Sequence, residues 1–184
     1  MTSVALNLRM RIGDWLNGFS SMRRSASFSG SLSSKGKILI LSEIATEEDK
    51  KLVSAAKKRF RDICPKAEVD IVCHCPKDVA GCALISDKGE EYFTDKDLSF
   101  FFKIKSQSLR ESLASRHDIL VLLAGDKAQT LNYIAKYVNA DLRVGRAGTI
   151  LDKRGVLNFV VESHTDAKEM ASVMASTLAM MFGE

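Results

Sequence analysis

Small and charged residues that could hold a ligand follow the apolar runs of this 184-residue chain. We expect these runs to be parallel strands, and such sheets bind ligands at the carboxyl ends of the strands, beside the point where strand order reverses. This rule selects eight candidate ligand-binding residues: Ser42, Glu43, Gly125, Asp126, Gly145, Arg146, His164 and Thr165. The rule selects loops and not chemistry, because the sequence shows no acid–base or nucleophilic arrangement among them.

A conventional phosphate cradle is not predicted after the first strand. A dinucleotide site needs closely spaced glycines there, so that backbone N–H groups reach the pyrophosphate. The turn at 42–46 reads Ser-Glu-Ile-Ala-Thr and has no glycine. A nucleotide site remains possible at two other turns. One is Gly125-Asp126, which precedes a helix, and the other is Arg143–Gly155, which combines glycines with basic residues. The competing interpretation is that Asp126 caps its helix and that Arg143–Gly155 is a solvent-exposed turn.

The cysteines do not predict a metal site. Structural zinc ligands come in pairs two to four residues apart, whereas Cys73, Cys75 and Cys82 fit that spacing poorly. On a strand, Cys73 and Cys75 share one face and His74 points to the other. Four cysteines without an export signal indicate reduced thiols and a cytoplasmic protein. We predict no cofactor, no metal and no catalytic residue, and an enzyme only with a partner chain.

Alternating strand and helix patterns supply the scaffold for the candidate residues. The expected strands are Lys37–Ser42, Glu68–Cys75, Ile119–Ala124, Leu142–Gly145 and Leu157–Glu162. The expected helices are 46–63, Ser108–Ala114, Lys127–Val138 and Asp166–Phe182. This alternation implies a mostly parallel sheet covered on both sides. We predict a single open, three-layer, Rossmann-like α/β domain over residues 35–184, with a flavodoxin-like strand order as the alternative.

We predict that residues 1–34 form a basic amphipathic helix and a Ser-rich linker. Apolar residues recur there at helical spacing, namely Val4, Ala5, Leu8, Ile12, Trp15, Leu16 and Phe19. The formal net charge of +4 lies entirely within residues 1–36, because the rest of the chain holds equal numbers of basic and acidic residues. A nucleic-acid surface is therefore not expected on the folded body.

Three interpretations of this N-terminal helix stay open. Residues 4–19 could bind an anionic membrane surface or a partner protein, the segment could be a targeting peptide, or the apolar stripe could dock on the domain. No stretch of the chain reaches the length needed to cross a bilayer.

The stretch Tyr92–Lys103 contains four of the nine phenylalanines. We expect Thr94 or Asp95 to cap a short helix there, with its aromatic residues plugging one end of the sheet. An exposed aromatic cluster would instead mark a partner site.

Four stretches carry a resemblance to a known family: Tyr92–Lys105, His117–Leu123, Leu131–Tyr137 and Ala140–Gly145. Together they resemble a family of short bacterial proteins of unknown function, which implies a basic N-terminal helix followed by one Rossmann-like domain. Phe101 stands where that family's aromatic motif has a tryptophan. The portion Ile119–Gly145 is also similar in style to the nucleotide-sugar-binding halves of two-lobed glycosyltransferases. No catalytic residue is implied.

These observations predict a noncatalytic interaction module in the cytoplasm, peripheral to the membrane through its N-terminal helix. The alternative is a domain that binds a nucleotide or nucleotide sugar at the carboxyl ends of its strands. The sequence does not indicate an oligomeric state.

Overall fold

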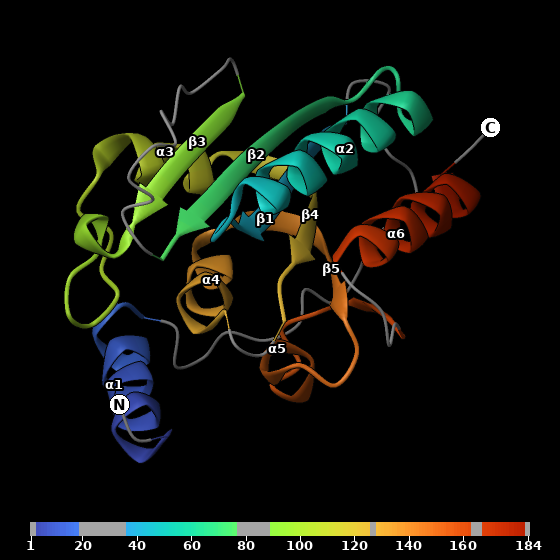
Figure 1. Ribbon diagram of the computed structural model, residues 1–184. Helices are drawn as coiled ribbons and strands as arrows, with labels where there is room; N and C mark the ends of the chain where they lie inside the picture. Colours follow the sequence, from blue (N-terminus) through green and yellow to red (C-terminus); the bar gives the residue numbers. More distant parts are fainter. Residues whose placement is uncertain (1–2, 19–35, 77–88, 126–127, 163–166, 183–184) are drawn as a thin grey trace.

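The computed structural model describes residues 3–18, 36–76, 89–125, 128–162 and 167–182 (Figure 1). The helices are α1 (Ser3–Leu16), α2 (Glu47–Ile63), α3 (Gln107–Ala114), α4 (Gln129–Ile134), α5 (Ile150–Lys153) and α6 (Ala167–Phe182). The strands are β1 (Lys37–Glu43), β2 (Glu68–Cys75), β3 (Glu90–Thr94), β4 (Arg116–Leu123), β5 (Asn139–Arg146) and β6 (Phe159–Val161). Two single 3-10 turns are η2 (Asp95–Asp97) and η3 (Ala135–Tyr137).

The six described strands form one sheet in the order β3-β2-β1-β4-β5-β6. Every neighbouring pair is parallel, including β1 with β4, where Ser42 is paired with Leu123. The strand order runs one way from β1 to β3 and the other way from β4 to β6, so it reverses between β1 and β4. The predicted Rossmann-like α/β fold is confirmed, and the flavodoxin-like order is not adopted.

Both faces of the sheet are covered by helices, which makes three layers (Figure 1). One face of β1 and β4 contributes Leu39, Leu41, Leu120 and Leu122 to a core shared with α3 and α4. The alternate residues Ile38, Ile40, Ile119 and Val121 pack on the other face against α2 and α6. Because β1 and β4 are buried on both faces, they read as continuous apolar runs in the sequence.

The start of α2 follows the predicted capping pattern. Thr46 lies in the extended region, and its side chain accepts a hydrogen bond from the Asp49 amide. Asp49 returns the contact by accepting from the Thr46 amide at 2.8 Å. This reciprocal capping box satisfies amides that have no partner within the helix.

Several predicted elements need correction. β3 was missed, because Glu90 and Glu91 interrupt the apolar pattern of a short edge strand. The short helix expected after Thr94 is only the turn η2, although Thr94 caps it as predicted. The turn expected between the last two strands contains α5, which lets β6 run parallel to β5. The helix expected over Lys127–Val138 ends at Ile134 and continues as η3.

The predicted N-terminal helix is present as α1, but of the stripe residues whose burial is described, only Ile12 is half-buried and the others do not pack on the domain. Met10 and Gly13 are buried, whereas Leu8, Trp15 and Leu16 are exposed. The proposed boundary at residue 34 stays a prediction, since residues 19–35 lie outside the described residues.

Candidate functional site

The carboxyl ends of the parallel strands bring five of the predicted ligand-binding residues to one edge of the sheet. Ser42 and Glu43 end β1, Gly125 follows β4, and Gly145 and Arg146 end β5. The other three, Asp126, His164 and Thr165, lie outside the described residues. Ligand binding at these positions stays a prediction.

The described residues of β1, α2 and β4 meet where the strand order reverses. A cavity of about 40 Å³ lies there, lined by Ser42, Glu43, Asp49, Leu52, Val53 and Leu123. This volume holds about one water molecule, whereas small-molecule sites occupy several hundred Å³. Asp49 Oδ2 also accepts from the amides of Ala45 and Thr46 at 3.0 and 2.8 Å. A carboxylate therefore occupies two backbone amides of the turn that leads into α2, and its negative charge disfavours a phosphate there.

His74, at the end of β2, lies between two carboxylates. Its Nδ1 is 3.4 Å from Glu43 Oε2, and its Nε2 is 3.1 Å from Asp95 Oδ1. The imidazole is buried against the Phe93 ring, with 5.0 Å between ring centroids. Thr130 Oγ1 donates to the same Asp95 oxygen at 3.4 Å. These contacts connect β1, β2, η2 and α4 at the carboxyl edge.

The sequence predicts Glu43 at this edge, and the expected strand Glu68–Cys75 has His74 near its carboxyl end, but Asp95 was missed as their neighbour. Asp95 reaches the cluster because β3 pairs with β2 and ends at Thr94, and β3 was not predicted. His74 is too deeply buried to touch a substrate directly. Among the described residues, no cluster of three or more His, Cys, Asp or Glu side chains could hold a metal ion.

Packing and backbone conformation explain the glycines in and after the last residues of β5. A Cβ atom added at Gly145 would lie 2.7 Å from Leu157 Cδ1, so the glycine permits close approach of that side chain. Gly148 has a φ of +76°, and its amide donates to Asp152 Oδ2 at 2.9 Å. Arg146 is half-buried beside this turn, and its carbonyl accepts from Thr149 Oγ1.

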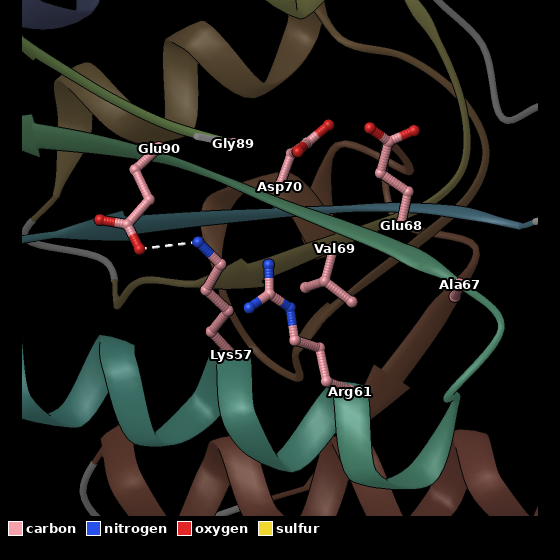
Figure 2. Close-up of a pocket in the computed structure, with 8 residues that line it drawn as sticks. All are labelled: Lys57, Arg61, Ala67, Glu68, Val69, Asp70, Gly89 and Glu90. Atoms are coloured by element: carbon pink, nitrogen blue, oxygen red, sulfur yellow. Dashed lines mark hydrogen bonds and ion pairs between the residues drawn. The ribbon is translucent and has the colours of Figure 1, made fainter. Parts of the chain in front are cut away.

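A larger hollow, of about 570 Å³, lies at the opposite edge of the sheet, where β2 and β3 begin (Figure 2). Lys57 and Arg61 of α2 lie on one side of β2, while Glu68 and Asp70 lie on the other. Lys57 Nζ is 2.7 Å from Glu90 Oε1. Burial alone would raise the pKa of Glu90, but hydrogen bonds from Lys57 and Tyr92 outweigh it and lower that pKa. The buried Lys57–Glu90 pair thus joins α2 to the edge strand β3.

α1 is attached to the domain mainly by polar contacts. Asp14 accepts a hydrogen bond from the buried ammonium of Lys136 and lies 3.3 Å from Arg154 Nη1. Asn17 Nδ2 donates to the Tyr133 hydroxyl at 3.2 Å and to the Phe101 carbonyl at 3.1 Å. These partners belong to α4, η3, the turn after α5 and the loop after η2, so long-range contacts fix the position of α1.

Gly13 lets α1 lie close to Tyr133 and to the backbone at Phe101. A Cβ atom there would lie 2.8 Å from the Tyr133 hydroxyl and 2.9 Å from the Phe101 carbonyl oxygen. Met10 inserts beside it and is 3% exposed. The buried face of α1 is therefore the face carrying Met10, Gly13 and Asn17.

The opposite face of α1 carries apolar side chains that the described part of the domain does not cover. Leu8, Trp15 and Leu16 are 59, 74 and 52% exposed, and Arg11 is exposed on the same side. We call Leu8, Arg11, Trp15 and Leu16 the outward face. Within the described part of the chain, no helix combines the length and apolar character needed to span a bilayer.

The comparisons with known proteins give a family but no function. No curated protein and no solved structure matches the chain. The similarity in style to glycosyltransferase halves therefore has no support from a matching protein. One family model matches residues 16–172, from the last residue of α1 into α6, and thus covers most of the chain. This protein belongs to a family of unknown function (DUF6913).

Proposed function

We propose that this protein is a noncatalytic interaction module that attaches peripherally to an anionic membrane surface through the outward face of α1. The observation that carries this proposal is the exposure of Leu8, Trp15 and Leu16 on a helix that is docked by its other face. A helix fastened by Asp14, Gly13 and Asn17 does not need an apolar stripe to stay attached. Exposed apolar surface of this kind marks an interaction site.

Charge favours a membrane over an apolar protein groove. Arg11 is exposed one turn before Trp15, and residues 1–36 carry five basic residues against Asp14 alone. Asp14 is turned away from solvent toward Lys136 and Arg154. Basic side chains beside an apolar helix face add attraction to anionic lipids, and tryptophan is favoured at the boundary between headgroups and acyl chains.

The proposal places the protein at the cytoplasmic leaflet, where anionic lipids are enriched. Cys64 and Cys73 are unbridged thiols, which supports a reducing compartment. Burial raises the pKa of Cys73 strongly, so its thiol stays protonated and unreactive.

Vesicle binding tests the proposal directly, because Trp15 is the single tryptophan of the chain. With phosphatidylserine-containing vesicles, we expect a blue shift of Trp15 emission and quenching by lipids brominated on their acyl chains. Each buried CH₂ contributes about 0.8 kcal/mol, so the loss of about two buried groups weakens binding tenfold. The Leu8→Ala/Leu16→Ala variant removes more carbon than that and should bind at least about tenfold more weakly. Binding should also fall as salt is added.

The matched control is Met180→Ala on α6, an apolar side chain that is 80% exposed on the other side of the sheet. It should bind vesicles like the unmodified chain. If Trp15 emission does not change with anionic vesicles, or if both variants bind equally, the proposal is wrong.

Nucleotide or nucleotide-sugar binding at the carboxyl edge is the second candidate. The reversal of strand order between β1 and β4 supports it, while the capping carboxylate of Asp49 opposes a phosphate at α2. A ligand at 100 times its dissociation constant should raise the unfolding free energy by about 2.7 kcal/mol. A thermal-shift screen against nucleotides and nucleotide sugars measures this, and no shift in any of them would remove the candidate.

A further inference from the structure

The loop that follows η2 exposes one phenylalanine of a run of three. Leu98 and Ile104 close the loop by an antiparallel bridge, and Ser99 accepts a hydrogen bond from the Phe102 amide at 2.9 Å. Phe102 has a φ of +62°, a left-handed conformation that a bulky side chain rarely adopts. This turn buries the Phe102 ring, while Phe100 stays 62% exposed. We call Leu98–Ile104 the aromatic loop.

The fixed position of Phe102 holds the aromatic loop in place. Its ring stacks on Tyr133 with 4.5 Å between ring centroids. The Tyr137 hydroxyl donates to its carbonyl at 3.2 Å. Backbone strain of this kind persists only where the surroundings impose it. Phe100 therefore lies in a turn whose conformation is fixed by packing.

Phe100 lies next to α1. The Arg9 guanidinium is 4.8 Å from the centroid of the Phe100 ring and 4.1 Å from that of Phe102. Arg9 Nε also donates to the Phe100 carbonyl. Figure 1 shows the loop after β3 beside the blue helix α1. The exposed ring is therefore a direct neighbour of the helix that carries the outward face.

The charge around Phe100 also fits an anionic surface. Lys96, Lys103 and Lys105, within and beside the aromatic loop, are exposed. The nearby carboxylate of Asp97 accepts hydrogen bonds from the Thr94 amide and hydroxyl, and that of Asp95, which is 64% exposed, is paired with His74. Three lysines thus outnumber these two carboxylates. An exposed aromatic ring among lysines is the composition that interfacial segments use.

We propose that Phe100 is a second membrane-inserting side chain, so that the protein holds an anionic bilayer at two points, the outward face of α1 and the tip of the aromatic loop. This inference rests on the proposed membrane attachment. Two braced contacts fix the orientation of the domain, whereas a single helix would leave it free to tilt. Since the loop leaves the carboxyl end of β3, that edge of the sheet turns toward the bilayer.

Moving the single tryptophan tests the inference. The variant Trp15→Phe/Phe100→Trp has its only tryptophan at the loop tip, and Trp15→Phe/Met180→Trp places it on α6. With phosphatidylserine-containing vesicles, we expect brominated lipids to quench the tryptophan at position 100 and to leave the one at 180 unquenched. In the otherwise unmodified chain, Phe100→Ala should weaken vesicle binding about tenfold. It should change the thermal midpoint little, because Arg9 keeps its contact with the Phe102 ring.

The outcomes separate the two proposals. If Trp15 of the unmodified chain is quenched but the tryptophan at position 100 is not, or if Phe100→Ala binds normally, the second contact is wrong and the attachment through α1 stands. If the unmodified chain does not bind anionic vesicles at all, both proposals fall.

Discussion

Asp14 provides the carboxylate for the most buried ammonium group in the contact between α1 and the domain. Lys136 is 5% exposed, and its Nζ lies 4.6 Å from the centroid of the Tyr133 ring. Burial lowers the pKa of Lys136, and the hydrogen bond and charge of Asp14 oppose that shift. A buried ammonium without its carboxylate would keep the desolvation penalty but lose most of the electrostatic attraction that offsets it.

We expect Asp14→Asn to reduce the free energy of unfolding by about 2 kcal/mol, because it leaves Lys136 without a counter-charge. Chemical denaturation measures the change. The matched control is Asp141→Asn, which breaks an exposed ion pair with Arg116. The side chain of Arg116 is 76% exposed and that of Asp141 is 42% exposed. That substitution should reduce the free energy of unfolding by less than about 1 kcal/mol. Equal losses in the two variants would show that the Asp14–Lys136 pair contributes no more than a surface ion pair.

Among single residues, sequence reasoning found those that belong to predicted strands. Ser42, Glu43 and His74 were placed at the carboxyl edge, because their strands were recognised from apolar runs. Asp95 was missed, since its position depends on β3. The role of Gly13 could not be inferred either, because its contacts come from Phe101 and Tyr133, far along the chain.

At the scale of elements, the central strands and long helices were predictable and the position of α1 was not. Continuous apolar runs identified β1 and β4, and Thr46 with its acidic neighbours identified the start of α2. Periodicity in α1 identified a helix and its apolar stripe. It could not show which face would dock, because the docking partners Asp14–Lys136 and Asn17–Tyr133 are polar pairs distant in sequence.

Gly13→Ala tests whether α1 is docked by its small and polar face. Alanine favours an isolated helix over glycine by about 0.8–1.0 kcal/mol, but the added Cβ would lie 2.9 Å from the Phe101 carbonyl oxygen. We expect the clash to prevail, so that α1 amides exchange hydrogen for deuterium faster. Arg11→Ala, on the outward face, is the control and should leave exchange unchanged. Slower exchange in Gly13→Ala would mean that helix propensity dominates and that the close approach is absent.

At the scale of the whole molecule, the ionisation of the three tyrosines monitors the packing on both faces of the sheet. Tyr92 packs against the core on the α2 and α6 side, and Tyr133 and Tyr137 on the α3 and α4 side. Burial is the largest cause that raises the pKa of each phenol; the pKa of Tyr137 rises to about 12. An unfolded chain ionises its tyrosines near pH 10, the ordinary pKa of a solvent-exposed tyrosine.

The folded chain therefore keeps protons that the unfolded chain releases above about pH 10. Stability from this source is complete below that pH and is lost as the pH rises through the folded pKa values. In an alkaline titration followed by near-ultraviolet absorbance and circular dichroism, we expect phenolate to appear together with loss of structure. Tyr137→Phe should make the decline of stability with pH shallower. If all three tyrosines ionise at their ordinary pKa while the circular dichroism is intact, the full burial of Tyr133 in the core is wrong.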